Sequence, residues 1–406
     1  MKQRMLFSRG LILSTLIKIS MDSAVGMNLT APPDLHHFSF SAFSILAASG
    51  TGNILLSPYS IASALALTLA GCTPLSPCQT EIENVLGISS HEEMATVRKE
   101  LATLPSSSSE EEVTGVELVM ANSIWTSSSI KADYINLVEQ THNALANPLP
   151  RSYQTIDDWI SKNTNGLLKN VVSGDIDQSI VALLISVIRF KGIWELKFDV
   201  NKTKRGDFHL FGGAHNRSVD YMHAEEKMDV LSFVEGLGGA SVVRLPYANN
   251  DFYALFVLPR ENTPQSMYDA IQGLTNMDEL FDDSTTFPRR AVSLTLPRFS
   301  VSYGTVSLKE MLQEMGMKTA FGGNSGENIF SAMSSDPSVY VDDVLHKVIL
   351  EVNEEGTTAA AATIVSVGRS LPRPPVDMTF NRPFLMVVIG RGVPLFIGQI
   401  VDFGEV

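Results

Sequence analysis

The chain has 406 residues, of which 44% are hydrophobic, so it holds enough apolar material for a large core. Its formal net charge of −14 leaves no broad basic surface for phosphates, which argues against a nucleic-acid-binding protein. No apolar stretch is long enough to cross a bilayer, so we expect no membrane span.

Residues 1–33 are expected to form an N-terminal extension with a targeting role. Basic residues from Lys2 to Arg9 precede the apolar run Leu11–Ile17, an order typical of a signal peptide, here with cleavage after Gly26. Lys18 interrupts the run, so an organelle transit peptide and a start of translation at Met21 stay open as alternatives. The pattern favours an extracellular location over a cytoplasmic or organellar one.

Predicted helices dominate the first half of the chain and predicted strands the second. Ser57 followed by Pro58 is a strong helix start, and continuous β-branched runs are typical of buried strands. The predicted helices are Phe38–Ala48, Pro58–Leu69, Thr155–Lys162 and Leu308–Met317. The predicted strands are Ile180–Phe190, Ala240–Leu245, Asp251–Leu258, Val292–Leu296, Val339–Val344, Lys347–Val352, Phe384–Val388 and Leu395–Val401.

This order of elements predicts the fold class. Helices first and strands later, without regular alternation, indicate an α+β fold with antiparallel or mixed sheets. The strands are scattered along the chain and no linker separates them, so residues 34–406 are expected to form a single domain.

The sequence does not decide whether the two cysteines pair or whether the glycosylation triplets are used. Cys72 and Cys78 are the only cysteines, and they fit a disulfide and two free thiols about equally well. Acceptor triplets for N-glycosylation stand at Asn28, Asn201 and Asn216, although such triplets often arise by chance.

Motifs for catalysis are missing from the sequence. There is no phosphate-binding P-loop, no nucleophile elbow and no His-Glu-x-x-His pair. Asp402-Phe403-Gly404 matches the kinase tripeptide, but it lies at the extreme C-terminus, where no activation segment can follow. His36-His37 has no third ligand in view. We therefore expect no enzyme, no metal site and no cofactor.

The segment Gly356–Gly368, GTTAAAATIVSVG, carries no charge in a chain that is 18% charged. Its alanines favour helix, while its threonines, isoleucine and valines favour strand. If it forms a strand, both faces carry small uncharged side chains, so it could enter the middle of a sheet at little desolvation cost. An ordinary buried strand or a small-residue helix is the alternative. Such a local conflict is typical of a switching segment.

A series of motifs resembles the serpin family in the right order over about residues 35–403. NILLSPYSIASALALTL at Asn53–Leu69 is similar to the family's shutter helix, and VYVDDVLHKVILEVNEEGTTAAAAT at Val339–Thr363 to a main-sheet strand followed by the reactive-loop hinge. The remaining matches are ISKNTNGL, FKGIW, LPY, LPRFS, MLQEMGMKTAF, FNRPF and LFIGQIV. The resemblance implies helices packed on a large central mixed sheet, with two smaller sheets and an exposed reactive-centre loop at about 354–378.

By this resemblance the hinge of the reactive loop runs from Glu354 to Thr363. Gly356 matches the flexible hinge glycine and Thr357 the first residue to insert. Thr358 stands where many relatives have Glu. The alanine run of inhibitory members is matched by Ala359, Ala360, Ala361 and Ala362.

The reactive bond is expected next to a basic residue, since a trypsin-like protease needs a cation for the acid in its specificity pocket. Arg369-Ser370 is the first choice. The family's commonest spacing would place the cut one residue later, after Ser370, and Arg373 is a third candidate that Pro374 disfavours.

Other matched residues lie near the main sheet. Trp194 and His346 match the region at its top where insertion begins, and Ser57 and Ser60 match the shutter region below. Ser186 stands where the family usually has Asn and cannot make both amide hydrogen bonds, which puts the shutter network in doubt.

The implied function is suicide inhibition of a serine protease, with a trypsin-like enzyme as the favoured partner. A non-inhibitory carrier or chaperone and an inhibitor of papain-like cysteine proteases are the alternatives. A monomer is expected. Heparin activation is not, because Glu92–Glu112 holds only Arg98 and Lys99 as adjacent basic residues.

Overall fold

The computed structural model describes residues 33–48, 50, 52–102, 116–164, 166, 168–169, 171–177, 179–213, 216–248, 251–281, 287–322, 327–355 and 374–403. Eight α-helices are described in these ranges. They are α1 (Pro33–Ala48), α2 (Pro58–Gly71), α3 (Pro77–Leu86), α4 (His91–Ala102), α5 (Ala132–His142), α6 (Tyr153–Asn163), α7 (Pro264–Thr275) and α8 (Lys309–Glu314). None of the described helices is long and apolar enough to cross a membrane.

The described strands form two sheets. A five-stranded sheet has the order β10-β11-β4-β2-β3, and a nine-stranded sheet the order β1-β14-β13-β8-β7-β6-β9-β12, with β5 on β6. The strands are β1 (Ile54–Leu56), β2 (Val116–Thr126), β3 (Leu145–Pro148), β4 (Ala182–Gly192), β5 (Lys204–His209), β6 (Asn216–Val234), β7 (Ala240–Pro246), β8 (Phe252–Leu258), β9 (Arg289–Pro297), β10 (Phe299–Ser307), β11 (Asp343–Val352), β12 (Val376–Thr379), β13 (Phe384–Gly390) and β14 (Val393–Ile400).

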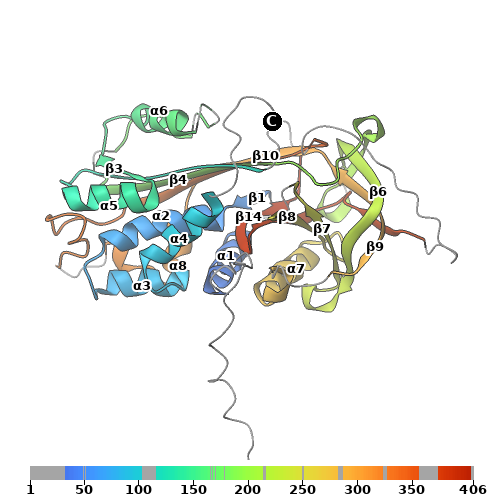
Figure 1. Ribbon diagram of the computed structural model, residues 1–406, viewed down its shortest axis with the longest axis horizontal. Helices are drawn as coiled ribbons and strands as arrows, with labels where there is room; N and C mark the ends of the chain where they lie inside the picture. The colour runs from blue at the N-terminus through green and yellow to red at the C-terminus, as the bar shows by residue number, and fades with distance from the viewer. Residues whose placement is uncertain are drawn as a thin grey trace, which may run out of the picture.

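The five-stranded sheet lies between two helical layers (Figure 1). Helix α6 covers one face, where Ile156 and Ile160 join a core cluster with Leu183, Ile185 and Val187 of β4. Helix α2 contacts β2 and β4 from the other face, and every residue of α2 is buried. The pairing is parallel between β4 and β11 and antiparallel between β4 and β2, so the sheet is mixed, as expected.

The nine-stranded sheet differs from the expectation of two smaller sheets. Strand β6 is 19 residues long and pairs through its first part with β5 and β9 and through its last part with β7. This long strand joins the two expected sheets into one array, visible at the right of Figure 1. Helices α1 and α7 pack against each other below it.

Two predicted boundaries were wrong. The strands predicted at Val339–Val344 and Lys347–Val352 are one continuous strand, β11, that begins at Asp343. Val339 and Val341 before it are buried without being part of a strand. Val341 N–H donates to the Ala320 carbonyl, and the half-buried Asp342 carboxylate accepts from the amides of Val181 and Ala182 at the start of β4. Helix α1 begins at Pro33, ahead of the predicted Phe38.

The two cysteines are paired in a disulfide that links the end of α2 to the start of α3. Both are buried within the core. Thr73, just after Cys72, exchanges backbone and side-chain hydrogen bonds with residues 328–331, so this turn is fixed on both sides.

Candidate functional site

The central strands of the five-stranded sheet part at one end. β4 and β11 are paired from Leu183 opposite Asp343 to Phe190 opposite Leu350. The ladder ends there, although β4 extends to Gly192 and β11 to Val352. The gap between the strand ends is a pocket lined by Lys191, Gly192, Trp194, Tyr247, Glu351, Val352, Asn353 and Glu355. The sheet therefore opens at the end from which the chain continues toward residue 356.

Aromatic rings form one wall of this pocket. Trp194 stacks on Tyr247 with the ring centroids 4.4 Å apart, and its Nε1 donates to the Asn353 carbonyl at 3.1 Å. A Cβ at Gly192 would lie only 2.5 Å from the Tyr247 ring, so this position admits glycine alone without movement of the ring. The rings hold the end of β11 while leaving the pocket open.

Glu354 fixes the chain at the start of the predicted hinge. Its carboxylate is only 4% exposed and accepts a hydrogen bond from Thr203 Oγ1 at 2.7 Å. The Arg298 guanidinium lies 3.6 Å away and is half exposed. Because a buried carboxylate needs such partners, Thr203 and Arg298 keep Glu354 docked. Glu355, next in the chain, is exposed.

A polar cluster lies under the middle of the same strands. His346 on β11 pairs with Ser186 on β4, and both side chains are fully buried. His346 Nε2 accepts the Ser57 N–H at 3.1 Å, and its Nδ1 lies 3.2 Å from the Ser186 carbonyl. Ser186 Oγ donates to the Ser60 carbonyl at 2.9 Å and also meets the Ser60 hydroxyl. This network joins β4, β11 and the start of α2.

The hydrogen bonds of His346 fix its protonation. A backbone N–H can only donate, so Nε2 must be unprotonated and Nδ1 carries the proton that Ser186 accepts. Burial lowers the pKa of His346 to about 4, against a smaller opposing effect of the Ser186 carbonyl. The imidazole is therefore neutral at neutral pH.

This arrangement corrects one predicted grouping. His346 was expected beside Trp194 at the top of the sheet, but it lies with Ser57 and Ser186. The reason is register, since His346 stands opposite Ser186 and four residues before the last pair of the β4–β11 ladder. Ser186 takes part in the network although it lacks the amide of the family's usual Asn. Its hydroxyl bonds to Ser60, and its carbonyl accepts from His346.

The rest of the predicted hinge and the reactive bond lie outside the described residues. The structure places Glu354 but not the residues after Glu355. The predicted positions without a described placement are Gly356, Thr357, Thr358, Ala359, Ala360, Ala361, Ala362, Thr363, Arg369 and Ser370.

Two residues of this site, Thr203 and Arg298, were not predicted from the sequence. Thr203 was seen only as the third residue of a glycosylation triplet, and Arg298 only as part of a family-like motif. Nothing local marks them as partners of Glu354, since they are separated from it by 151 and 56 positions and meet it only in the folded protein.

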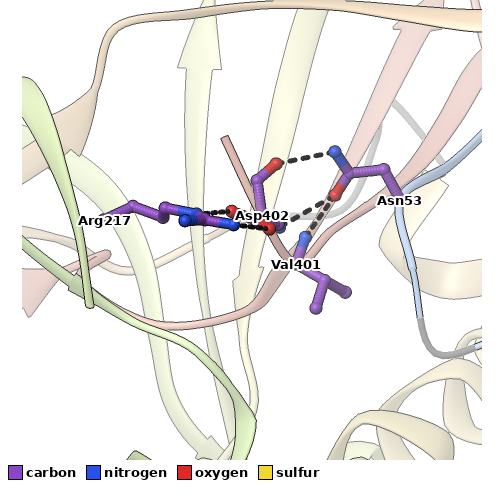
Figure 2. A network of polar contacts seen from close by, with 4 residues as sticks. All are labelled: Asn53, Arg217, Val401 and Asp402. Carbon is purple, nitrogen blue, oxygen red and sulfur yellow. Dashed lines mark hydrogen bonds and ion pairs between the residues drawn. The ribbon is translucent and has the colours of Figure 1, made fainter. Parts of the chain in front are cut away.

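Asp402, dismissed above as a chance kinase match, has a structural role (Figure 2). Arg217 Nε and Nη2 donate to its two carboxylate oxygens at 2.7 and 3.0 Å. Asn53 Nδ2 donates to its carbonyl at 2.6 Å, while Asn53 Oδ1 accepts from Val401 and Asp402. The network ties the end of β14 to β6 and to the residue before β1.

No metal site is evident among the residues that the structure covers, since no three potential ligands converge there. His36 is buried and donates through Nε2 to the Gly392 carbonyl at 2.8 Å, while His37 is exposed. His36 therefore belongs to the core, whereas His37 lies at the surface.

Known proteins resemble this chain over nearly its whole length. A family model described as Serpin (serine protease inhibitor) matches residues 34–403. Antithrombin-III of Ovis aries is 29% identical over 385 residues, which cover 90% of this chain and 80% of that protein. Serpin-Z10 of Arabidopsis thaliana is 30% identical over 376 residues, covering 88% and 94%. The structure of human thyroxine-binding globulin has a TM-score of 0.77 at 24% identity, covering 92% and 98%.

Proposed function

Since this chain belongs to the serpin family, we propose that it inhibits a trypsin-like serine protease as a suicide substrate cleaved after Arg369. The observation that carries the proposal is the open end of the β4–β11 ladder, which lies directly before the hinge and beside the docked Glu354. A strand can enter the middle of a sheet where two neighbouring strands part, and this opening adjoins the uncharged segment Gly356–Gly368.

The reaction begins as ordinary proteolysis. The protease serine attacks the carbonyl of Arg369, the bond to Ser370 breaks, and the new amine of Ser370 leaves with the proton that the protease base delivers. The product is an ester between Arg369 and the protease, and the residues before Arg369 are released from their C-terminal attachment.

Insertion then competes with hydrolysis of this ester. Thr357 to Val367, at roughly 3.3 Å per residue, moves the acylated end by on the order of 36 Å. Insertion must separate β4 from β11, which breaks their parallel ladder and replaces it with two new ladders. The protease is carried to the far end of the sheet and distorted before water releases it. That insertion of a reactive loop is a form of strand addition is a known property of serpins.

The decisive experiment looks for a covalent product. Incubation with trypsin should give a complex that survives a denaturing gel, with Arg369 as the new C-terminus by mass spectrometry. Arg369→Ala should lose the complex with trypsin, whereas Arg373→Ala, the matched control, should keep it.

The alternatives give other results in the same assay. A complex with papain but not with trypsin would replace the target class. Cleavage without any complex, over trypsin-like, elastase-like and papain-like proteases, would leave a carrier or chaperone function and reject the proposal.

A further inference from the structure

We propose that Asn201 carries an N-linked glycan, which covers an apolar surface next to the hinge. Asn201-Lys202-Thr203 is an acceptor triplet, and it lies at the surface in and just after the short helical turn η1 (Val200–Lys202). Both Asn201 and Lys202 are exposed. Thr203 lies between this turn and the docked Glu354, so the glycan would stand two residues from the hinge contact.

The amide of Asn201 can accept a sugar without losing its present hydrogen bond. Its Nδ2 donates to Asp199 Oδ1 at 3.0 Å, and its backbone N–H donates to the same oxygen, also at 3.0 Å. A primary amide has two N–H groups, and N-glycosylation replaces one of them. The second N–H can continue to donate to Asp199, so the turn that presents Asn201 is compatible with the modified side chain.

Two exposed apolar side chains precede Asn201 in the chain. Leu196 is 44% exposed and Val200 is 62% exposed, in a segment that leads directly to Asn201. They are two of the five large hydrophobic side chains that are exposed in the described ranges. A bulky hydrophilic glycan would shield such side chains from contact with other proteins.

The disulfide points to the compartment in which glycans are added. Cys72 and Cys78 are paired and buried, and structural disulfides persist where the environment is oxidising, as in the secretory pathway. The disulfide is independent of the triplet, and it favours the compartment in which glycosylation of Asn201 would take place.

The transfer also has a defined chemistry and timing. The donor is a lipid-linked oligosaccharyl pyrophosphate: its sugar C1–O bond breaks, a C1–N bond forms to Asn201 Nδ2, the amide proton is lost to base, and the lipid pyrophosphate leaves. The acceptor triplet requires the Thr203 hydroxyl, which in the folded protein is bonded to Glu354. Modification must therefore precede docking of the hinge.

The test uses the full chain, with its own N-terminus, produced in animal cells. The other two triplets are removed by Asn28→Gln and Asn216→Gln, and both medium and lysate are collected. Treatment with peptide-N-glycosidase should lower the mass and convert Asn201 to Asp in the peptide map. An unmodified Asn201 peptide in both fractions would overturn the proposal.

Three variants in this background separate the glycan from the hinge contact. Asn201→Gln should lose the glycan and keep the Thr203–Glu354 bond, Thr203→Ser should keep both, and Thr203→Val should lose both. The purified Asn201→Gln protein should bind more of an apolar-surface dye than Thr203→Ser. Equal dye binding by these two proteins would reject the shielding role, and a glycan on Asn201→Gln would reject the site.

Discussion

The buried polar side chains of the site work as connectors between elements. His346 joins β11 to the start of α2, and Glu354 joins the end of β11 to Thr203 and Arg298. An unpaired buried polar group costs about 1–3 kcal/mol, so each of these contacts is retained only while both partners stay in place. Loss of one partner should therefore weaken the sheet at a defined point.

His346 should make the stability of the native form depend on pH. Its pKa is lowered by burial to about 4, from an ordinary value of 6.5. The unfolded chain thus binds the proton first, and stability is lost as the pH falls from about 6.5 to 4, by up to about 1.4 kcal/mol per pH unit. Protonation at Nε2 also removes the acceptor of the Ser57 N–H.

His346→Gln should reduce this pH dependence, measured as the denaturant midpoint of the native form between pH 7 and pH 5. Part of the slope should remain, because burial also lowers the pKa values of His91 and His142. His37→Gln, at an exposed position, is the control and should leave the slope unchanged. Equal slopes for wild type and His346→Gln would contradict the prediction.

Glu354→Gln should destabilise the native form by about 1–2 kcal/mol, because a charge-assisted hydrogen bond and an ion pair are both weakened. The measurement is the midpoint of denaturant unfolding. Glu355→Gln removes a charge from the neighbouring exposed position, and it should change the midpoint little. If the two variants behave alike, the docking of Glu354 does not stabilise the fold.

For single residues, the sequence predicts which side chains belong to the site better than it predicts which side chains they contact. Ser57, Ser60 and Ser186 could be assigned to one region because each stands at a position that matches the family's shutter. The partners of Glu354 could not, since Thr203 precedes β5 and Arg298 lies between β9 and β10, far from Glu354 in the sequence, and no local pattern carries that information.

At the scale of elements, the central strands β4 and β11 set what the sheet can do. β4 was predicted well, because a continuous β-branched run is typical of a strand that is buried on both faces. β11 was predicted as two strands because His346 interrupts its apolar pattern. The structure keeps it continuous since the buried imidazole is satisfied by Ser57 and Ser186, a compensation that only the tertiary packing supplies.

Gly192→Ala should test the opening between these strands. The added Cβ would meet the rings of Tyr247 and Phe190 at 2.5 and 2.8 Å, so the wall of the pocket must shift. Overpacking of this kind costs typically about 1–3 kcal/mol. We expect a lower unfolding midpoint and, if loop insertion begins here, a larger fraction of inhibitor that is cleaved without trapping the protease.

Gly304→Ala on β10 of the same sheet is the matched control. A Cβ at Gly304 would meet nothing within 4 Å, so neither stability nor the trapped fraction should fall. If Gly192→Ala has the same stability and traps the same fraction of protease as Gly304→Ala, the pocket accommodates the added Cβ and the prediction is wrong.

At the scale of the whole molecule, the fold could be predicted because its motifs are spread over nearly the entire chain and keep their order. The joining of the expected smaller sheets through β6 could not, since it depends on one strand pairing with different partners along its length. The proposed mechanism adds a further condition: the native form must hold β4 and β11 together although a better-paired sheet is available.

Cleavage of the reactive loop should therefore raise the stability of the molecule. An inserted central strand adds about ten backbone hydrogen bonds at roughly 1 kcal/mol each, a gain on the order of 10 kcal/mol before the cost of ordering the loop. The intact and the cleaved protein are compared by thermal melting after limited proteolysis, and the cleaved form should melt at a much higher temperature.

Thr357→Arg places a charge at the first residue to insert, and a buried unpaired charge is strongly unfavourable. This variant should be cleaved at the same bond with a smaller rise in melting temperature and should no longer trap the protease. A rise as large as that of the wild type would place the start of insertion elsewhere, and no rise in either protein would mean that the open end of the β4–β11 ladder receives no strand.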